Sequence, residues 1–188
     1  MMGVLVCGIG LLVACGRGVV KTERSPLPSV AAPPYACDHI PLKAIEMMTG
    51  TRDPVVRGSF DLELMGGIGY GTCTVYRRDG DQLKVLQVGL TAGGYSEKVK
   101  EQIETGAPPL PEIVPGAVGY YFKDKDSERN AAYALLSRGK AQITVQLEVG
   151  AAGRDNAADV LALMKLIAPR LITDAGAPSA SPSSKRSS

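Results

Sequence analysis

Four cysteines, at positions 7, 15, 37 and 73, constrain this chain of 188 residues more than any other residue type. Cysteines of exported domains usually pair as disulfides, whereas those of cytosolic proteins usually stay reduced. The covalent framework therefore depends on which cysteines remain in the mature chain and on which side of the membrane that chain resides. The N-terminal residues bear on both points.

Residues 4–14 form an uncharged apolar run, V-L-V-C-G-I-G-L-L-V-A. As a helix, this run would cover about half of the roughly 30 Å hydrocarbon core of a bilayer, so it is too short to span a membrane. An apolar run of this kind that ends in small residues is typical of a secretory signal peptide. We expect residues 1–14 to direct export and then to be removed. Residues 1–3 lack the Lys or Arg with which signals normally begin, and a start codon upstream of Met1 would account for this.

The run ends in Leu12-Val13-Ala14-Cys15, which resembles the lipobox of bacterial lipoproteins. The resemblance implies that Cys15 receives a diacylglyceryl group and becomes the first residue of the mature chain. Cys7 follows Val6 inside the apolar run and fits this processing rule poorly. Two acyl chains, at about 0.8 kcal/mol per buried CH₂, would anchor the chain stably to the extracytoplasmic face of the cell membrane. The alternative is a cytosolic protein with an apolar N-terminus.

Removal of Cys7 with the signal and lipidation of Cys15 leave Cys37 and Cys73. These two residues have no CxxC spacing, and no His cluster accompanies them as in a metal site, so a disulfide is the simplest interpretation. A closed loop of about 37 residues would stabilise the fold by roughly 4 kcal/mol. The alternative is a pair of buried free thiols.

Composition suggests one globular domain between two polar segments. Residues 15–34, after the signal, are rich in Gly, Pro, Ser and Ala and have no apolar period, which favours a flexible linker. Residues 173–188 are similarly poor in large apolar residues, so we expect a disordered tail. The globular domain is then expected over residues 35–172.

Apolar periodicity predicts the elements of this domain. A short amphipathic helix is expected over residues 41–49, and a mostly exposed one over 96–105. Strands are expected over 69–78 and 83–91 as a hairpin, over 117–122, 131–137 and 142–149 as a meander, and as an additional strand over 60–65. A last helix, capped by Asp155 or Asn156, carries an apolar stripe that we expect to cover the sheet.

Strands thus occur in clusters rather than in regular alternation with helices. This order favours the α+β class, with an antiparallel sheet of about five or six strands and two or three helices packed on it.

Several segments of the domain match a known pattern. Ala36-Cys37-Asp38 precedes the expected helix that ends at Gly50, and Gly71-Thr72-Cys73 leads into a strand. Together with the lipobox and the spacer, they make the chain resemble a family of small actinobacterial cell-envelope lipoproteins of unassigned function. The resemblance covers residues 35–171; within it, His39-Ile40-Pro41 replaces the usual Leu-Leu-Ser/Thr of the family. It implies a Cys37–Cys73 disulfide and a fold like the PsbP-like α+β sandwiches, but no reaction.

Composition disfavours several classes of function. A net charge of +2, from scattered Lys and Arg, gives no electrostatic track for nucleic acid. Trp is absent and His occurs once, so general bases and metal ligands are scarce. We therefore expect no cofactor, no metal and no enzymatic activity. The rival hypothesis is an envelope hydrolase in which Asp38 orients His39 as a base.

The remaining candidates are tyrosines near the ends of the expected elements, where an aromatic face with a polar tip suits recognition. These ligand-binding candidates are Tyr70, Tyr95, Tyr120 and Tyr121, and edge packing is the alternative for each. The sequence thus predicts a lipid-anchored binding module for an envelope partner protein or an apolar ligand. A structural envelope component without a discrete ligand is a further alternative.

Overall fold

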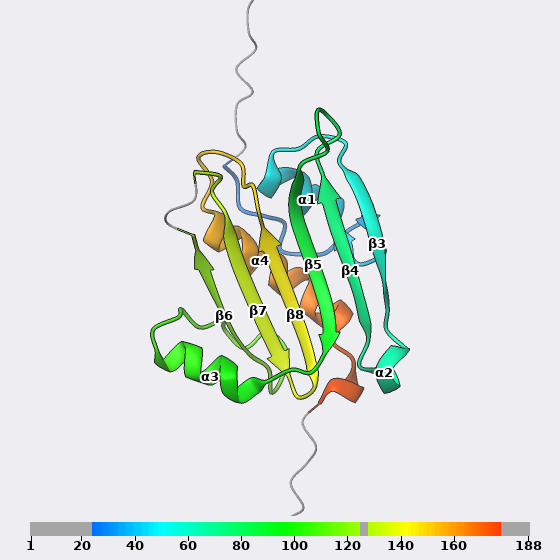
Figure 1. Ribbon diagram of the computed structural model, residues 1–188, viewed down its shortest axis with the longest axis vertical. Coiled ribbons are helices and arrows are strands. Elements are labelled where there is room, and N and C mark those ends of the chain that lie inside the picture. The colour runs from blue at the N-terminus through cyan, green and yellow to red at the C-terminus, as the bar shows by residue number, and fades with distance from the viewer. Residues whose placement is uncertain (1–23, 125–127, 178–188) are drawn as a thin grey trace, which may run out of the picture.

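The computed structural model describes residues 24–124 and 128–177, which form one α+β unit (Figure 1). Within these residues an antiparallel sheet of six strands has the order β3-β4-β5-β8-β7-β6, and a two-stranded sheet pairs β1 with β2. The predicted fold class is confirmed. The strands are β1 (Tyr35–Ala36), β2 (Ile40–Pro41), β3 (Val55–Asp61), β4 (Tyr70–Tyr76), β5 (Lys84–Ala92), β6 (Val118–Lys123), β7 (Ala132–Arg138) and β8 (Ala141–Leu147). The helices are α1 (Leu42–Thr49), α2 (Leu64–Gly67), α3 (Ser96–Glu104), α4 (Asn156–Leu171) and the 3-10 helix η1 (Asp174–Gly176).

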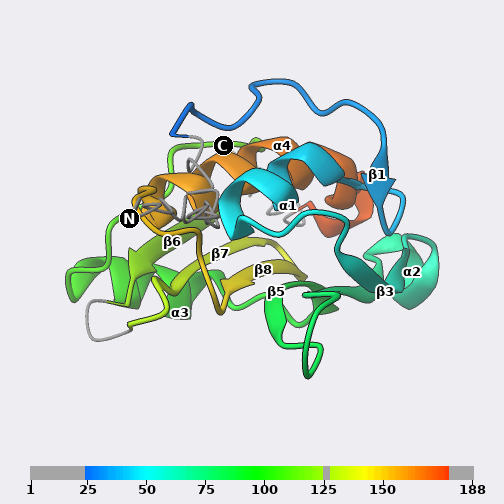
Figure 2. The ribbon, with the colours of Figure 1, turned by 90° about the horizontal axis from the view of Figure 1, so that it is seen from above.

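Two helices cover one face of the six-stranded sheet, and a third lies on the other face. Figure 2 shows α1 and α4 together above the sheet and α3 below it. The predicted stripe of α4 faces the sheet: Leu163, Met164 and Ile167 are fully buried, as are Ile143 and Val145 of β8. On the other side, Val99 anchors α3 by its buried side chain, and the Ser96 and Ser137 hydroxyls lie 3.3 Å apart.

Local sequence signals fix the ends of the helices. An Asp155 carboxylate oxygen accepts a hydrogen bond of 3.1 Å from the Ala158 N–H at the start of α4, which is the expected N-cap. Gly50 ends α1 with a left-handed backbone, φ 67°, where a residue with a Cβ would be strained.

The predicted hairpin and meander are both present, and one further pairing joins them. β4 pairs with β5, and β6, β7 and β8 follow one another as a meander. The joining pair is β5 with β8, in which Val88 lies opposite Val145. This long-range pairing makes a single sheet with one continuous core face.

The strand expected over residues 60–65 lies elsewhere. β3 occupies Val55–Asp61, and the chain turns directly after it into α2. The Asp61 carboxylate accepts hydrogen bonds from the N–H groups of Glu63 and Leu64, so it ends the strand by a side-chain turn. The alternation of apolar and polar residues over 60–65 therefore predicted strand wrongly beyond Asp61.

Cys37 and Cys73 form the disulfide that the sequence predicts, with Cα atoms 6.0 Å apart. Cys37 follows β1, and Cys73 is fully buried in β4. The bond therefore fastens the N-terminal segment of the domain to the sheet. The alternative of free thiols is excluded.

The globular unit is longer than the sequence suggests at both ends. Residues 24–34, assigned to the linker, run along the helical layer, where Leu27 is buried (Figure 2). Residues 173–177, assigned to the tail, include η1, and the Thr173 hydroxyl donates to the Gly67 carbonyl. The reason is that a single apolar side chain or a few hydrogen bonds hold each segment, which composition alone does not reveal.

The expected signal at 1–14, Cys15 and the rest of the tail, 178–188, lie outside the described residues. In the part of the chain that is described, no helix has both the length and the apolar content needed to cross a membrane.

Candidate functional site

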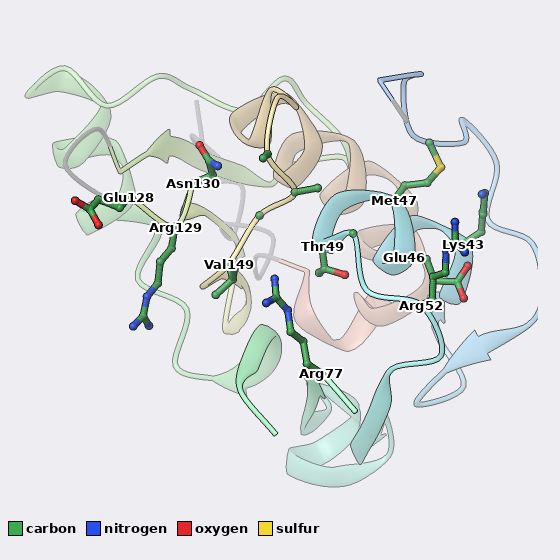
Figure 3. Close-up of a pocket in the computed structure, with 14 residues that line it drawn as sticks. Lys43, Glu46, Met47, Thr49, Arg52, Arg77, Glu128, Arg129, Asn130 and Val149 are labelled. Carbon is green, nitrogen blue, oxygen red and sulfur yellow. The ribbon is translucent and has the colours of Figure 1, made fainter. Parts of the chain in front are cut away.

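A pocket of about 590 Å³ opens at the end of the molecule where α1 ends and α4 begins. Four segments far apart in the sequence surround it: the end of α1 with the following turn, the β4–β5 hairpin, the residues before β7, and the β8–α4 loop (Figure 3). Its lining residues are Lys43, Glu46, Met47, Thr49, Gly50, Arg52, Arg77, Glu128, Arg129, Asn130, Val149, Gly150, Ala151 and Ala152.

Hydrogen bonds between these segments build the floor of the pocket. The Ala151 N–H donates to the Met48 carbonyl over 2.8 Å, and the Gly150 N–H donates to the Arg129 carbonyl over 2.9 Å. Gly150 has no room for a side chain, because a Cβ there would lie 2.4 Å from the amide nitrogen of Asn156. The floor is therefore closely packed and fixed before any ligand arrives.

A buried ion pair holds the β8–α4 loop that contributes residues to this floor. Two guanidinium nitrogens of Arg154 donate to the two carboxylate oxygens of Asp159, each over 2.7 Å. Both side chains are buried, so the bidentate geometry compensates the loss of water around the two charges. The pair fixes the loop against α4.

Cationic side chains outnumber anionic ones around the pocket, with Lys43, Arg52, Arg77 and Arg129 against Glu46 and Glu128. Arg77 extends between Thr49 and Val149 toward the middle of the group (Figure 3). Its side chain is half-buried, and among the described residues no hydrogen bond or ion pair engages its guanidinium. The neighbouring Arg78, in contrast, is paired with Asp53 over 2.9 Å. The pocket thus has one central cation whose donors are available.

Two buried oxygen atoms without a partner lie beside the pocket. Thr51, whose Oγ1 makes no hydrogen bond, stands between the lining residues Gly50 and Arg52. Asn156 packs against Gly150 and donates to the Asn130 carbonyl over 2.9 Å, yet its Oδ1 accepts nothing. Leaving such atoms without a partner typically costs about 1–3 kcal/mol each.

The proposed base, His39, is a packing residue in this structure. Its ring stands edge-on to Phe60 at 5.8 Å, and Arg170 donates to its backbone carbonyl over 3.1 Å. No hydrogen bond links the Asp38 carboxylate to the imidazole within the described residues. Burial, followed by the positive charge of Arg170, lowers the pKa of His39, and nearby Asp38 opposes this shift. The structure therefore does not form the Asp-His dyad that the hydrolase hypothesis needs.

The four candidate tyrosines do not converge on one site. Tyr95 and Tyr120 line a second pocket, of about 310 Å³, between α3 and the sheet. Tyr70 lies on β4, separated from β6 by three strands, and is 51% exposed. Tyr121 packs against the core on the opposite face of the sheet, as the alternative of edge packing requires. Only the first two share a concave surface.

The described residues contain no group of three or more His, Cys, Asp or Glu side chains close enough to hold a metal ion. This finding concerns residues 24–124 and 128–177 alone.

Sequence reasoning missed the charged pocket because its residues belong to turns rather than to motifs. Arg52, Arg77 and Arg129 follow three different elements, and nothing in the sequence places those turns together. The one feature of the sequence that could have indicated the pocket is that each of these turns contains an arginine near the end of a strand or helix.

Comparison of the chain with protein-family models, with curated proteins and with solved structures gives no match.

Proposed function

We propose that this protein is an exported binding module, anchored to the cell membrane through a lipid on Cys15, whose ligand carries an anionic group. The observation that carries the proposal is the half-buried Arg77 guanidinium, directed into a preformed pocket and engaged by no described residue. The Cys37–Cys73 disulfide supports the location, because such bonds persist mainly outside the cytoplasm.

The chemistry of the pocket selects the ligand class. A guanidinium is always charged and presents up to five N–H donors in a planar arrangement that matches a carboxylate or a phosphate. A pocket of about 590 Å³ lies in the usual size range of small-molecule sites. An anionic small molecule or headgroup therefore replaces the apolar ligand that the sequence suggested.

The test is calorimetric titration of the full chain, in neutral detergent at low salt, with inorganic pyrophosphate and with citrate. We expect binding of at least one probe, and Arg77→Gln should weaken it by about ten- to a hundredfold, because a hydrogen bond to a charged group is lost. Added salt should weaken binding further.

Arg78→Gln is the matched control, since it removes a neighbouring arginine that is exposed and bound to Asp53. It should leave the affinity unchanged. Equal affinities for the wild type and Arg77→Gln, or no binding of either anion, would overturn the proposal.

A further inference from the structure

The sheet face that α1 and α4 leave uncovered has an unusual surface over its three central strands. In Figure 1 this face is toward the viewer, with α4 behind the sheet. Alternation along β4, β5 and β8 places Thr or Gln at successive positions on it. We call this set the uncharged patch: Thr72, Thr74, Gln87, Gln142, Thr144 and Gln146.

The register makes the patch continuous from strand to strand. Gln146 lies opposite Gln87, and Gln87 lies opposite Thr74. In the next row, Thr144 and Thr72 both lie opposite Gly89, and the Thr144 hydroxyl lies over this buried glycine, where a Cβ would be only 2.9 Å from it. The result is a shallow surface of amides and hydroxyls.

Charged residues are absent from the patch but present around it. About a quarter of the residues of a typical soluble domain are charged. On this face the charges stand at the borders: Lys84 pairs with Glu148 over 3.1 Å, and Arg57 lies over the Tyr76 ring at 5.2 Å. The Lys84 ammonium also donates to the side-chain oxygen Oε1 of Gln87, which orients that amide.

An aromatic cluster adjoins the patch on β6 and β7. The Phe122 and Tyr133 rings lie 5.3 Å apart, and Phe122 and Tyr120 stack nearly parallel at 6.4 Å. Tyr133 is the register partner of Gln146, so rings and amides form one row. Burial, followed by the neighbouring Tyr120, raises the pKa of Tyr133 to about 12, which keeps its phenol neutral at ordinary pH. Phe122 leaves 44% of its surface exposed.

A groove continues this surface under α3. The second pocket, of about 310 Å³, is lined by Tyr95, Lys98, Val99, Glu101 and Gln102 from the α3 side and by Tyr120, Leu135 and Gln142 from the sheet. Gln142 therefore belongs to both the patch and the groove. Rings and amides face each other there across a space of small-molecule size.

We propose that the uncharged patch, the adjoining rings and the groove under α3 bind a neutral polysaccharide. Sugar hydroxyls both donate and accept hydrogen bonds, as do the Gln amides and Thr hydroxyls that face them. Rings supply flat apolar surfaces for the C–H faces of the sugars. At about 4.8 Å per strand, the row from β6 to β3 extends for roughly 24 Å, which is long enough for several sugar units.

Charge complementarity excludes the other occupants. A charged ligand would find no counter-charge on the patch, and in the groove the charges of Lys98 and Glu101 are opposite and equal in number. An apolar ligand would leave the amides of the patch without partners. The site is distinct from the charged pocket, because no residue of the patch lines that pocket and the two pockets share no lining residue.

The test is affinity electrophoresis of the full chain, in neutral detergent, through native gels that contain dextran, mannan or galactan. At least one of these neutral polymers should retard the protein. Phe122→Ser, and separately Gln87→Ala with Gln146→Ala, should each weaken retardation by about tenfold, because ring contacts or hydrogen bonds are lost. These side chains are exposed or half-buried, and circular dichroism checks that the variants fold.

Two controls separate this inference from the proposed function. Ser29→Ala removes an exposed polar side chain from the N-terminal segment, away from the patch, and should leave retardation unchanged. Arg77→Gln should weaken anion binding alone. The inference fails if no neutral polymer retards the chain, if the patch variants match Ser29→Ala, or if only anionic polygalacturonate retards it. Capture of a protein instead of a glycan by a photocrosslinker placed at Gln146 would overturn it as well.

Discussion

On strand β8, neighbouring residues serve opposite surfaces of the same sheet. Ile143 and Val145 are fully buried in the core that α4 covers, whereas Thr144 and Gln146 are only half-buried on the open face. The core face also contains the disulfide sulfur of Cys73. Burial is thus concentrated on one face of the sheet, which leaves the side chains of the other face and of the rim free to vary in chemistry. Four predictions test this division.

The largest effect is expected from the buried ion pair beside the core. Asp159→Asn should lower the free energy of unfolding by about 3–5 kcal/mol, because the buried Arg154 guanidinium loses the charged carboxylate that accepts two of its hydrogen bonds. Urea denaturation measures the loss. Replacement of both partners, Arg154→Met with Asp159→Leu, should restore most of it. A single variant that loses less than about 1 kcal/mol would contradict this prediction.

The two faces can be compared directly on β8. Ile143→Ala should cost about 2–5 kcal/mol, since it leaves a cavity among fully buried neighbours. Thr144→Ala should change stability by less than about 0.5 kcal/mol, because its side chain lies on the open face. Both values come from the same denaturation assay. Similar losses for the two variants would break the comparison.

The disulfide should contribute slightly less. Cys37→Ala with Cys73→Ala should lower the free energy of unfolding by roughly 2–4 kcal/mol, because the unfolded chain is no longer constrained over a sequence separation of 36 residues. Thermal unfolding measures it. Addition of a reducing thiol should destabilise the wild type equally and leave the double variant unaffected; a variant as stable as the wild type refutes the expectation.

The smallest effect concerns pH at His39. Burial and Arg170 lower its folded pKa below the ordinary 6.5. Above pH 6.5 the imidazole is neutral in both states, and as pH falls the unfolded chain takes up the proton first. Stability should therefore decline slightly between pH 6.5 and the lower folded pKa, then level off. His39→Gln should remove this slope. An identical pH profile for both proteins would show that the residue is uncoupled from folding.

The sequence predicted the local elements well because their signals are local. The capping residue Asp155 and the apolar stripe of α4 lie within the helix that they define, and Gly50 ends α1 as expected. Alternation also predicted the hairpin and the meander. The disulfide followed from the elimination of the other two cysteines.

The sequence could not predict that the hairpin and the meander form one sheet, nor where the two candidate sites lie. Both depend on contacts between residues far apart in the chain. Val88 and Val145 become neighbours only when β5 meets β8. The residues Arg77 and Arg129 converge on one pocket only after four turns are brought to the same end. Of the predicted tyrosines, Tyr95 and Tyr120 meet because α3 folds back over the sheet. The chemistry of tyrosine suggested a role in ligand binding, but the sequence did not show which of the tyrosines lie together.

The proposed function requires that the chain is exported and anchored as a domain closed by a disulfide. Intact-mass analysis of the protein extracted from membranes, before and after reduction, tests both features at once. We predict a chain that begins at an acylated Cys15 and gains two hydrogens on reduction, as the Cys37–Cys73 bond opens. A full-length, unmodified chain found in the soluble fraction, with a mass that reduction does not change, would contradict the account.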